Sequence, residues 1–278
     1  MQPILKWAGG KRKLIPDILK LFPANYKKMT YHEPFFGGGA IFFKIKPNSG
    51  SINDINSRLM TLYRVVRDQP EDLISQALQY DFEKETFYEL RDRFNQANVP
   101  DLERAAILLY LNKTSFNGLY RVNSKGEYNV PRGQYKHPTV VQEKRIRSAS
   151  VALRNVDIRN EDFSYILDYA KEGELCYFDP PYQPVSDTSN FTSYSVNGFD
   201  LTEQKRLRDV CLKLDSKDVY WVLSNSFATP VRELYAGIDG ITVKDVEAPR
   251  FISSKVSTRG LTKEILVTNI PEAQRKLI

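Results

Sequence analysis

The sequence predicts an α/β fold in which a mostly parallel sheet carries an inserted, mainly helical module. Short apolar runs typical of buried strands recur after residue 150 and alternate with an amphipathic helix. Before residue 57, a glycine triplet, a short helix, a short strand and an acid follow one another. From Ser57 to about Leu111 the apolar spacing is helical instead. The 278 residues are enough for a domain with a second one inserted in it.

The expected elements can be placed in chain order. A helix is predicted over Leu14–Phe22, a second over Ala40–Phe43, and a short strand at Ser51–Ile52. A later amphipathic helix runs from Asp200 to Leu214, with Asp200 as its N-cap. Five strands are expected after residue 150: Val156–Ile158, Leu175–Phe178, Val219–Leu223, Ile241–Val246 and Ile265–Val267.

This order of elements predicts two domains. Residues 1–56 and 151–278 form the α/β domain, and residues 57–150 form the helical insert. The insert ends in a basic, glycine-rich and aromatic loop region, in which Tyr128–Val130 is a candidate hairpin strand.

Basic residues are unevenly distributed along the chain, whose formal net charge is +6. From residue 112 to 147 there are eight Lys and Arg against two acids, and from 250 to 263 four against none. Such clusters favour a polyanionic partner. A solubilising face explains them equally well on charge alone.

The two cysteines, Cys176 and Cys211, each lie in an apolar segment. They have no metal-binding spacing and no disulfide framework, so we expect no metal site and a reduced, cytoplasmic setting. No secretory signal and no apolar run long enough for a membrane span is recognisable, so no membrane partner is expected.

The tetrapeptide Asp179-Pro180-Pro181-Tyr182 carries most of the chemical information. It follows a short apolar run, residues 174–178, so an acid, two prolines and an aromatic lie where a strand ends. The carboxylate of Asp179 and a proline carbonyl can each accept a hydrogen bond from a planar NH2 group, and Tyr182 can stack on the attached ring. The arrangement indicates a nucleobase amine as the reacting group.

The glycine triplet at residues 37–39 allows positive φ angles and the close approach of a ligand. Asp54 follows the next predicted strand, where nucleoside-binding α/β folds place an acid for ribose hydroxyls. The sequence has neither the GxGxxG pattern of dinucleotide sites nor a triphosphate loop. An adenosine-type ligand without a pyrophosphate fits better, and S-adenosylmethionine is one.

The segment Trp7-Ala8-Gly9-Gly10-Lys11 has two interpretations. Trp7 can line an apolar pocket, Gly9 and Gly10 allow close approach, and Lys11 can meet a carboxylate. Taken alone, a buried tryptophan and a solvated lysine are the simpler explanation. The two motifs above favour the functional one.

Asp162 and Phe163, after the strand at Val156–Ile158, could bond and stack an adenine ring. A helix N-cap followed by a core phenylalanine explains the pair nearly as well.

The basic loop of the insert contains Phe116 and the segment Asn117-Gly118-Leu119-Tyr120-Arg121. Arg121 can read guanine O6 and N7 bidentately, and an aromatic can wedge into a base step that a flipped base has left. The alternatives are a phosphate contact for Arg121 and core packing for Phe116 and Tyr120.

Together these residues resemble the Dam-type DNA adenine-N6 methyltransferases, the α group of the D12 class. The resemblance covers nearly the whole chain, and its motifs occur in that group's order. They are residues 6–11 (KWAGGK), 33–39 (EPFFGGG), 53–56 (NDIN), 117–123 (NGLYRVN), 129–131 (NVP), 179–182 (DPPY) and 190–194 (NFTSY).

The resemblance implies a Rossmann-like class I S-adenosylmethionine-dependent methyltransferase sheet with a helical target-recognition insert. It implies methyl transfer to N6 of a flipped adenine in double-stranded DNA, within GATC. The residues expected to act in catalysis are Asp179, Pro180 and Tyr182. Those expected to bind S-adenosylmethionine are Trp7, Gly9, Gly10, Lys11, Phe35, Gly37, Gly39, Asp54, Asp162, Phe163 and Asp179. Those expected to bind DNA are Lys6, Phe116, Asn117, Leu119, Arg121, Pro131 and Arg132.

Two positions depart from the family pattern. Phe116 stands where a family member carries tyrosine, and the ring needed for a wedge is kept. Gln134 stands where another carries a phosphate-contacting arginine, and Arg132 is the nearest substitute.

Other substrates remain open. Cytosine-N4 and protein-glutamine methyltransferases typically begin the tetrapeptide with serine and asparagine, so Asp179 favours adenine. RNA adenine would present the same flipped base, and a non-catalytic DNA-binding regulatory protein is a further alternative. A bacterial or phage-encoded enzyme that works beside a cognate restriction endonuclease, without a stable complex, fits the family.

Overall fold

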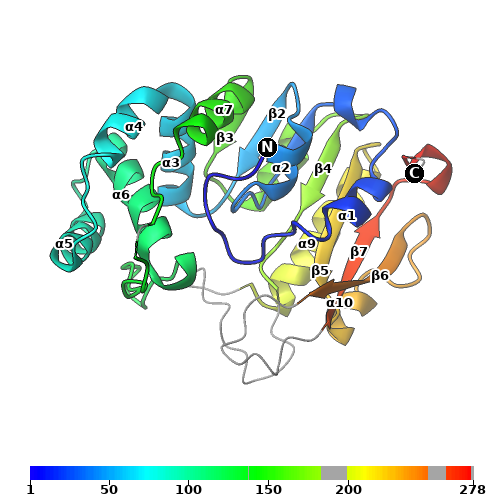
Figure 1. Ribbon diagram of the computed structural model, residues 1–278. Coiled ribbons are helices and arrows are strands. Elements are labelled where there is room, and N and C mark those ends of the chain that lie inside the picture. Colours follow the sequence, from blue (N-terminus) through cyan, green and yellow to red (C-terminus); the bar gives the residue numbers. More distant parts are fainter. Residues whose placement is uncertain (137, 183–198, 250–260, 277–278) are drawn as a thin grey trace. The chain divides into compact units, whose positions relative to one another are not determined.

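The computed structural model describes residues 1–136, 138–182, 199–249 and 261–276 (Figure 1). Their strands form one seven-stranded sheet in the order β3-β2-β1-β4-β5-β7-β6. The pairs β2–β3, β1–β4 and β4–β5 are parallel, whereas β7 is antiparallel to both β5 and β6. The predicted α/β class with a mostly parallel sheet is therefore confirmed, and the order β5-β7-β6 is that of a class I methyltransferase sheet.

Four of the predicted strands after residue 150 begin or end one or more residues from their expected bounds, and Leu175–Phe178 matches fully. The strands are β1 Tyr31–Glu33, β2 Gly50–Asn53, β3 Val156–Arg159, β4 Leu175–Phe178, β5 Tyr220–Ser226, β6 Thr242–Pro249 and β7 Leu261–Thr268. The helices are α1 Ile15–Leu21, α2 Ala40–Ile45, α3 Ser57–Asp68, α4 Pro70–Ala77, α5 Lys84–Phe94, α6 Asp101–Thr114, α7 Glu143–Leu153, α8 Ile166–Tyr169, α9 Leu201–Asp215 and α10 Thr229–Glu233.

Strand β1 is absent from the sequence prediction. All three of its residues are buried, although each of them is an ionisable type. Tyr31 donates a hydrogen bond to Glu33 (2.8 Å), and His32 pairs with Glu174 (2.9 Å). Side-chain pairing lets a strand of polar composition lie in the interior, and an apolar pattern cannot reveal such a strand.

The chain divides into two compact units, which we describe separately. The first comprises residues 1–10 and 36–162. The second comprises residues 11–35, 163–182, 199–249 and 261–276. The predicted insert, residues 57–150, lies wholly in the first unit together with β2 and β3. The predicted domain boundaries at 56/57 and 150/151 stay a prediction.

In the first unit, helix α6 lies at the centre of the helical part (Figure 1). Every residue of α6 from Ala105 to Thr114 is buried, and the helix packs against α3, α4 and α5. Helix α3 begins where Asn56 accepts a hydrogen bond from the backbone N–H of Leu59 (3.1 Å), which is an N-cap. In the loop after α6, Tyr128–Val130 forms no strand. The hairpin there is held by an isolated bridge between Val122 and Tyr128.

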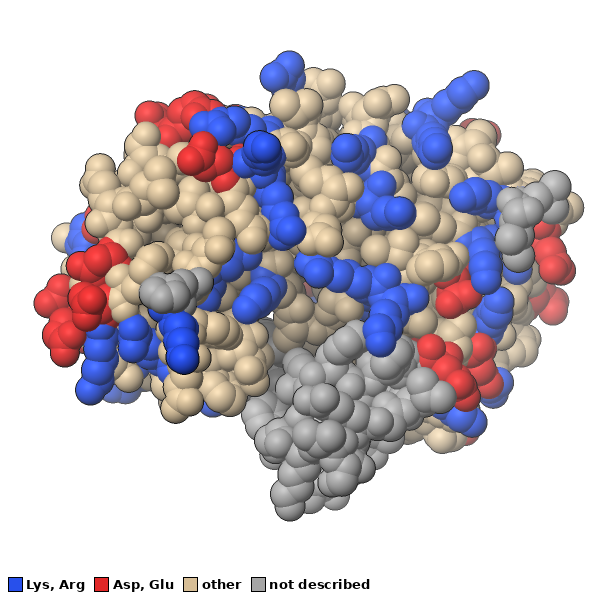
Figure 2. Space-filling view, in the orientation of Figure 1, with Lys and Arg blue, Asp and Glu red and all other residues tan. Residues whose placement is uncertain are grey.

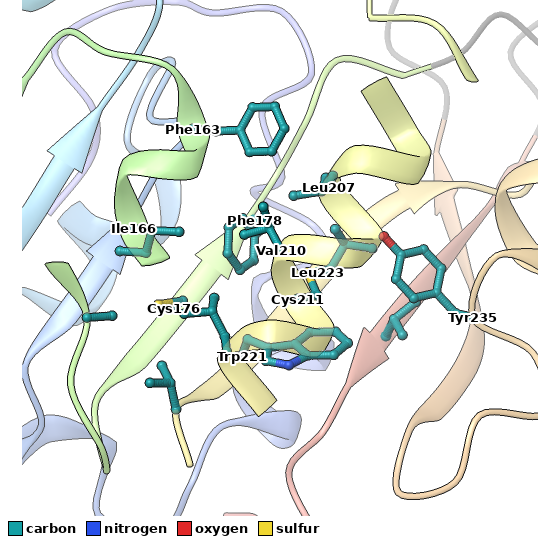
Figure 3. Close-up of a cluster of buried hydrophobic side chains, with 14 of the residues drawn as sticks. Phe163, Ile166, Cys176, Phe178, Leu207, Val210, Cys211, Trp221, Leu223 and Tyr235 are labelled. Carbon is teal, nitrogen blue, oxygen red and sulfur yellow. The ribbon is translucent and has the colours of Figure 1, made fainter. Parts of the chain in front are cut away.

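In the second unit, helix α9 packs on strands β4 and β5 through a hydrophobic cluster (Figure 3). Leu207, Val210 and Cys211 of the helix meet Phe178 and Trp221 of the strands. The predicted N-cap of this helix is confirmed, because Asp200 accepts hydrogen bonds from the N–H groups of its first turn. This packing fixes α9 beside the end of β4, where the tetrapeptide begins.

No helix within the described ranges is long and apolar enough to cross a bilayer. In the same ranges, no three His, Cys, Asp or Glu side chains gather as a metal site would need.

Candidate functional site

The first residue of the tetrapeptide, Asp179, follows directly after β4 in the second unit. Its Oδ1 lies 3.3 Å from the Lys11 amino group and accepts a hydrogen bond from Ser224 Oγ of β5 (3.0 Å). The side chain is 22% exposed, so it is largely enclosed but reachable. Asp179 is thus held between a cation and a hydroxyl group, with part of the carboxylate still accessible.

Lys11 is buried and connects the tetrapeptide to strand β7. Its Nζ lies 3.2 Å from Glu264 Oε2 and also contacts the Tyr182 hydroxyl, which donates a hydrogen bond to Glu264. Lys11, Asp179, Tyr182 and Glu264 therefore form one connected set of polar side chains, here called the Lys11 cluster. Lys11 thus meets two carboxylates of the protein itself, and its contact with the cofactor stays a prediction.

Glu264 was missed by the sequence analysis. It is 9% exposed and lies in β7 immediately before the buried run Ile265–Val267. The only available signal was an acid adjoining a fully apolar strand segment. An acid in that place is more often at a solvated strand face, so the signal is weak without the partner residues.

Burial and neighbouring charges set the protonation of Asp179. Desolvation is the largest effect and raises its pKa to about 6, with a further contribution from the Glu264 charge. The Lys11 charge and the Ser224 hydroxyl act in the opposite direction. With a pKa near this value, the carboxyl group is roughly nine-tenths ionised at pH 7 and can also take up a proton.

The two tyrosines nearest Asp179 remain neutral phenols. Burial raises the pKa of Tyr182 well above its usual value, and the charges of Asp179 and Glu264 add to this effect. Burial likewise raises the pKa of Tyr177, whose hydroxyl is paired with Ser224 Oγ (2.9 Å). Neither phenol is set up to act as an anionic base.

The residues predicted to hold a nucleoside lie mainly in the first unit. Asp54 follows β2 and accepts hydrogen bonds from the backbone N–H groups of Gly37 and Asn56, both at 2.9 Å. Burial raises its pKa, and these two bonds oppose the rise. Each carboxylate oxygen keeps a further acceptor site for a hydroxyl group, so Asp54 fits the ribose role predicted for it.

The glycine triplet is required by the packing of the protein itself. A Cβ atom at Gly37 or Gly38 would lie 2.8 or 2.9 Å from atoms of the Trp7 side chain, and one at Gly39 2.5 Å from Phe36. Gly37 and Gly39 also have positive φ angles of +49° and +65°. The close approach that the structure shows is that of Trp7 and Phe36. The close approach of a ligand, which the sequence indicated, stays a prediction.

Trp7 links the glycine loop to the basic loop within the first unit. Its ring stacks on Tyr120, with centroids 5.3 Å apart. The backbone of the preceding residue, Lys6, is held by Asn112, which accepts from Lys6 N–H (2.8 Å) and donates to the Lys6 carbonyl (2.7 Å) and to Gly118 (3.3 Å). Gly9 and Gly10 follow in exposed positions.

Phe35 and Phe163 lie together in the second unit. Their ring centroids are 5.2 Å apart, and the Arg206 guanidinium lies 4.4 Å from the centroid of Phe163. Phe163 is 5% exposed and begins a short 3-10 helix, so it is packed as the core alternative predicted. Phe35 is half-buried and Asp162, in the first unit, is exposed. A cofactor contact by these three residues stays a prediction.

The residues predicted to bind DNA all lie in the first unit. Phe116 is 52% exposed, which core packing would not allow, whereas Tyr120 is 7% exposed. Asn117 has a positive φ of 54° and is exposed beside Phe116. The two aromatics therefore separate: Tyr120 belongs to the core of the unit, and Phe116 is presented to solvent.

Several Lys and Arg side chains between residues 112 and 147 are held by other groups of the protein. Arg121 bonds to Asn129 across the hairpin (2.8 Å), and Arg132 donates to the Phe82 carbonyl (2.5 Å). Lys113 is buried and donates to the Ile4 carbonyl (2.5 Å), and Arg147 pairs with Glu71 (2.7 Å). Part of the basic excess at 112–147 thus serves the fold.

Exposed Lys and Arg side chains nevertheless outnumber acids over much of the face in Figure 2. Most of the second basic segment, residues 250–260, lies outside the described residues, as does the motif at 190–194.

Comparison with known families decides between the remaining possibilities. The model of the D12 class N6 adenine-specific DNA methyltransferases matches residues 7–249. The chain belongs to this family. It is therefore an adenine-specific DNA methyltransferase, and the predictions of the family and of N6 methylation are confirmed.

Relatives of similar length support the assignment. The type II methyltransferase M1.LlaDCHI of Lactococcus lactis subsp. cremoris is 43% identical over 276 residues, which is 97% of this chain and 95% of its own. The type II methyltransferase M.MjaIII of Methanocaldococcus jannaschii is 38% identical over 93% of this chain and 95% of its own length. The DNA adenine methylase of Escherichia coli K12 is 35% identical over 96% of this chain and 95% of its own length.

Proposed function

We propose that this methyltransferase transfers the methyl group of S-adenosylmethionine to N6 of an adenine that it extrudes from duplex DNA, within the sequence GATC. The observation that carries the proposal is the environment of Asp179. It is a reachable carboxylate after a parallel strand, ionised at neutral pH and followed by a proline carbonyl and a tyrosine.

The residues of the tetrapeptide support a direct transfer. The lone pair of adenine N6 is delocalised into the ring, so the nitrogen is a poor nucleophile. Asp179 and the Pro180 carbonyl accept its two N–H groups, which favours a pyramidal nitrogen with a localised lone pair. Transfer would form a bond from N6 to the methyl carbon of the donor as the bond from that carbon to sulfur breaks, and N6 would then lose one proton. Asp179, with a pKa of about 6, can receive it.

S-adenosylmethionine would supply an electrophilic methyl group at this site. In the first unit, Asp54 would take its ribose hydroxyls, and Trp7, Gly9, Gly10, Gly37 and Gly39 would also contact the donor. In the second unit, Lys11, Phe35, Phe163 and Asp179 would contribute, with Asp162 from the first. The double anchoring of Asp54 by backbone N–H groups supports this role because it holds the acceptor oxygens in place before the ligand arrives.

Extrusion of the target base costs a few kcal/mol. Stacking of the flipped adenine on Tyr182 returns about 1–3 kcal/mol, so the exchange is close to balanced. A wedge that fills the vacated step would tip it, and exposure of 52% makes Phe116 suitable.

We propose that Arg121 reads a guanine, and that Leu119 and Pro131 contact other bases. Lys6, Asn117 and Arg132 would position the loop on the backbone. Arg121 must leave Asn129 to do so, and it can, because both side chains lie at the surface of the hairpin.

The enzyme is tested by replacing its central acid. Asp179→Ala should abolish methyl incorporation into duplex DNA while binding to DNA persists. Near-normal methylation by the purified variant would overturn the mechanism.

The target sequence is tested separately. Plasmid treated with the enzyme should become resistant to a nuclease blocked by adenine methylation within GATC, and sensitive to one that requires it. Methylation of GATC-free DNA at the same rate would overturn the GATC proposal without touching the chemistry. Matched RNA serves as the competing substrate.

We further propose that the enzyme works beside a restriction endonuclease, without a stable complex, and in the cytoplasm. The relatives named type II methyltransferases support the first part.

A further inference from the structure

A fully buried pair of side-chain amides lies beneath the tetrapeptide in the second unit. Gln204 of α9 and Asn225 of β5 are both 0% exposed. Asn225 Oδ1 accepts from the Ser226 N–H (2.8 Å), so its Nδ2 is directed to Gln204 Oε1 (2.8 Å). The amide nitrogen of Gln204 then donates to the Pro181 carbonyl (3.3 Å). Each amide orients the next, from the strand to the loop.

The loop needs a side-chain donor of this kind. Pro180 and Pro181 have no N–H, so the middle of the tetrapeptide cannot be fixed by backbone donation. The proline ring holds φ of Pro181 near its single allowed value, and the peptide planes are rigid. Only ψ of Pro181 remains free between the Pro180 carbonyl and the Pro181 carbonyl. A hydrogen bond on the second carbonyl restrains this one torsion, and with it the direction of the first carbonyl.

Burying a glutamine and an asparagine in a helix–strand interface costs more desolvation free energy than burying two apolar side chains of similar size. Leucine or methionine in both places would fill the same space without polar atoms to satisfy. The pair is connected to the tetrapeptide, because the side-chain amide of Gln204 donates a hydrogen bond to the Pro181 carbonyl. The hydrogen bond to the Pro181 carbonyl therefore explains why glutamine and asparagine occupy these two buried positions.

We propose that Gln204 is a positioning residue for methyl transfer, held by Asn225, which aims the Pro180 carbonyl and fixes the start of Tyr182. Gln204 does not touch the substrate. It acts through the direction of the carbonyl that accepts one N6–H, and the proposal rests on that role of the tetrapeptide.

The test is the variant Gln204→Met, which keeps the volume and removes both hydrogen bonds. We expect kcat to fall about 10- to 100-fold, the size of effect that a misdirected catalytic group produces. Binding of S-adenosylmethionine and of cognate duplex, measured by titration, should be unchanged. The acid limb of the pH–rate profile should also stay in place, because no charge near Asp179 has changed.

Two further variants separate positioning from general stability. Gln204→Met with Asn225→Leu removes the side-chain amide that the single variant leaves without its partner, so thermal stability should recover in part while kcat stays low. Thr268→Val removes two other buried hydrogen bonds of the same unit, from Thr268 Oγ1 to the Trp221 carbonyl (2.6 Å) and from the Ile270 N–H to Thr268 Oγ1 (3.1 Å). It should lower stability without lowering kcat at a temperature where the variant is folded.

The proposal is wrong if Gln204→Met keeps the parent kcat, or if kcat returns together with stability in the double variant. Failure of the underlying function looks different, because Asp179→Ala would then remain active.

Discussion

Replacing Lys11 by methionine should move the acid limb of activity to higher pH. Lys11 is 5% exposed and its Nζ lies 3.3 Å from Asp179 Oδ1, so solvent screens the pair little. A cation at this distance lowers the pKa of an aspartate by about 1–3 units. Without it, the pKa of Asp179 should rise from about 6 to roughly 7–9.

The loss of activity follows from the sign of this shift. The ionised carboxylate is the active form, so activity is lost as pH falls through its pKa. With a pKa of about 8, roughly a tenth of the molecules are ionised at pH 7, and kcat/KM should fall about tenfold there and recover above about pH 9.

The assay is the initial rate of methyl incorporation into a GATC duplex between about pH 5 and 9.5, as kcat/KM for DNA. Saturating methyl donor is needed because Lys11 is also proposed to contact it. Glu264→Gln is the matched variant, since the Glu264 charge raises the pKa of Asp179. Its acid limb should move to lower pH. The electrostatic argument would be refuted if the acid limbs of the two pH–rate profiles stayed in place, or if they moved in the same direction in both variants.

Three other predictions concern single positions. Asp179→Asn should raise the free energy of unfolding at pH 7 by about 1–3 kcal/mol while abolishing activity, because a folded-state pKa of about 6 means that folding opposes the ionised form. Chemical denaturation at pH 7 and at about pH 3 checks it, and the gain should vanish at about pH 3, below both the folded and the unfolded pKa. Arg121→Ala should cost about 1–3 kcal/mol of discrimination at one guanine, measured on cognate and scrambled duplexes, whereas Lys125→Ala on the same hairpin should weaken both equally; equal losses for Arg121 would make it a phosphate contact. Gly39→Ala should lower the melting temperature, because its φ is +65° and a Cβ would meet Phe36 at 2.5 Å; an unchanged melting temperature would contradict the packing argument.

The parts of the site that the sequence predicted are those with a local signature. The tetrapeptide directly follows strand β4, and Asp54 directly follows strand β2, so strand ends and residue types were enough to place them. Glu264 has no such signature. It lies 253 positions from Lys11 and 82 from Tyr182 along the chain, and only the pairing of β7 brings it to them.

Side-chain pairing in the interior explains the other omissions. Strand β1 and the Gln204–Asn225 pair are both polar segments in buried places, which a pattern of apolar residues cannot show. Positive φ angles were predicted for the glycine triplet and occur at Gly37 and Gly39, but the neighbours that exclude a Cβ there, Trp7 and Phe36, were not foreseen.

The contacts of Trp7 and Asn112 constrain how the basic loop after α6, which we propose reads the target sequence, could be exchanged. Tyr120 shares a stacked face with Trp7, and Asn112 joins Lys6 to Gly118. A loop grafted from a relative with another target sequence would therefore also reshape the wall of the glycine turn, unless Tyr120 and Gly118 are kept. Altering sequence preference in this enzyme should succeed most readily through outward-facing positions such as Phe116 and Arg121, with the inward face of the loop left as it is.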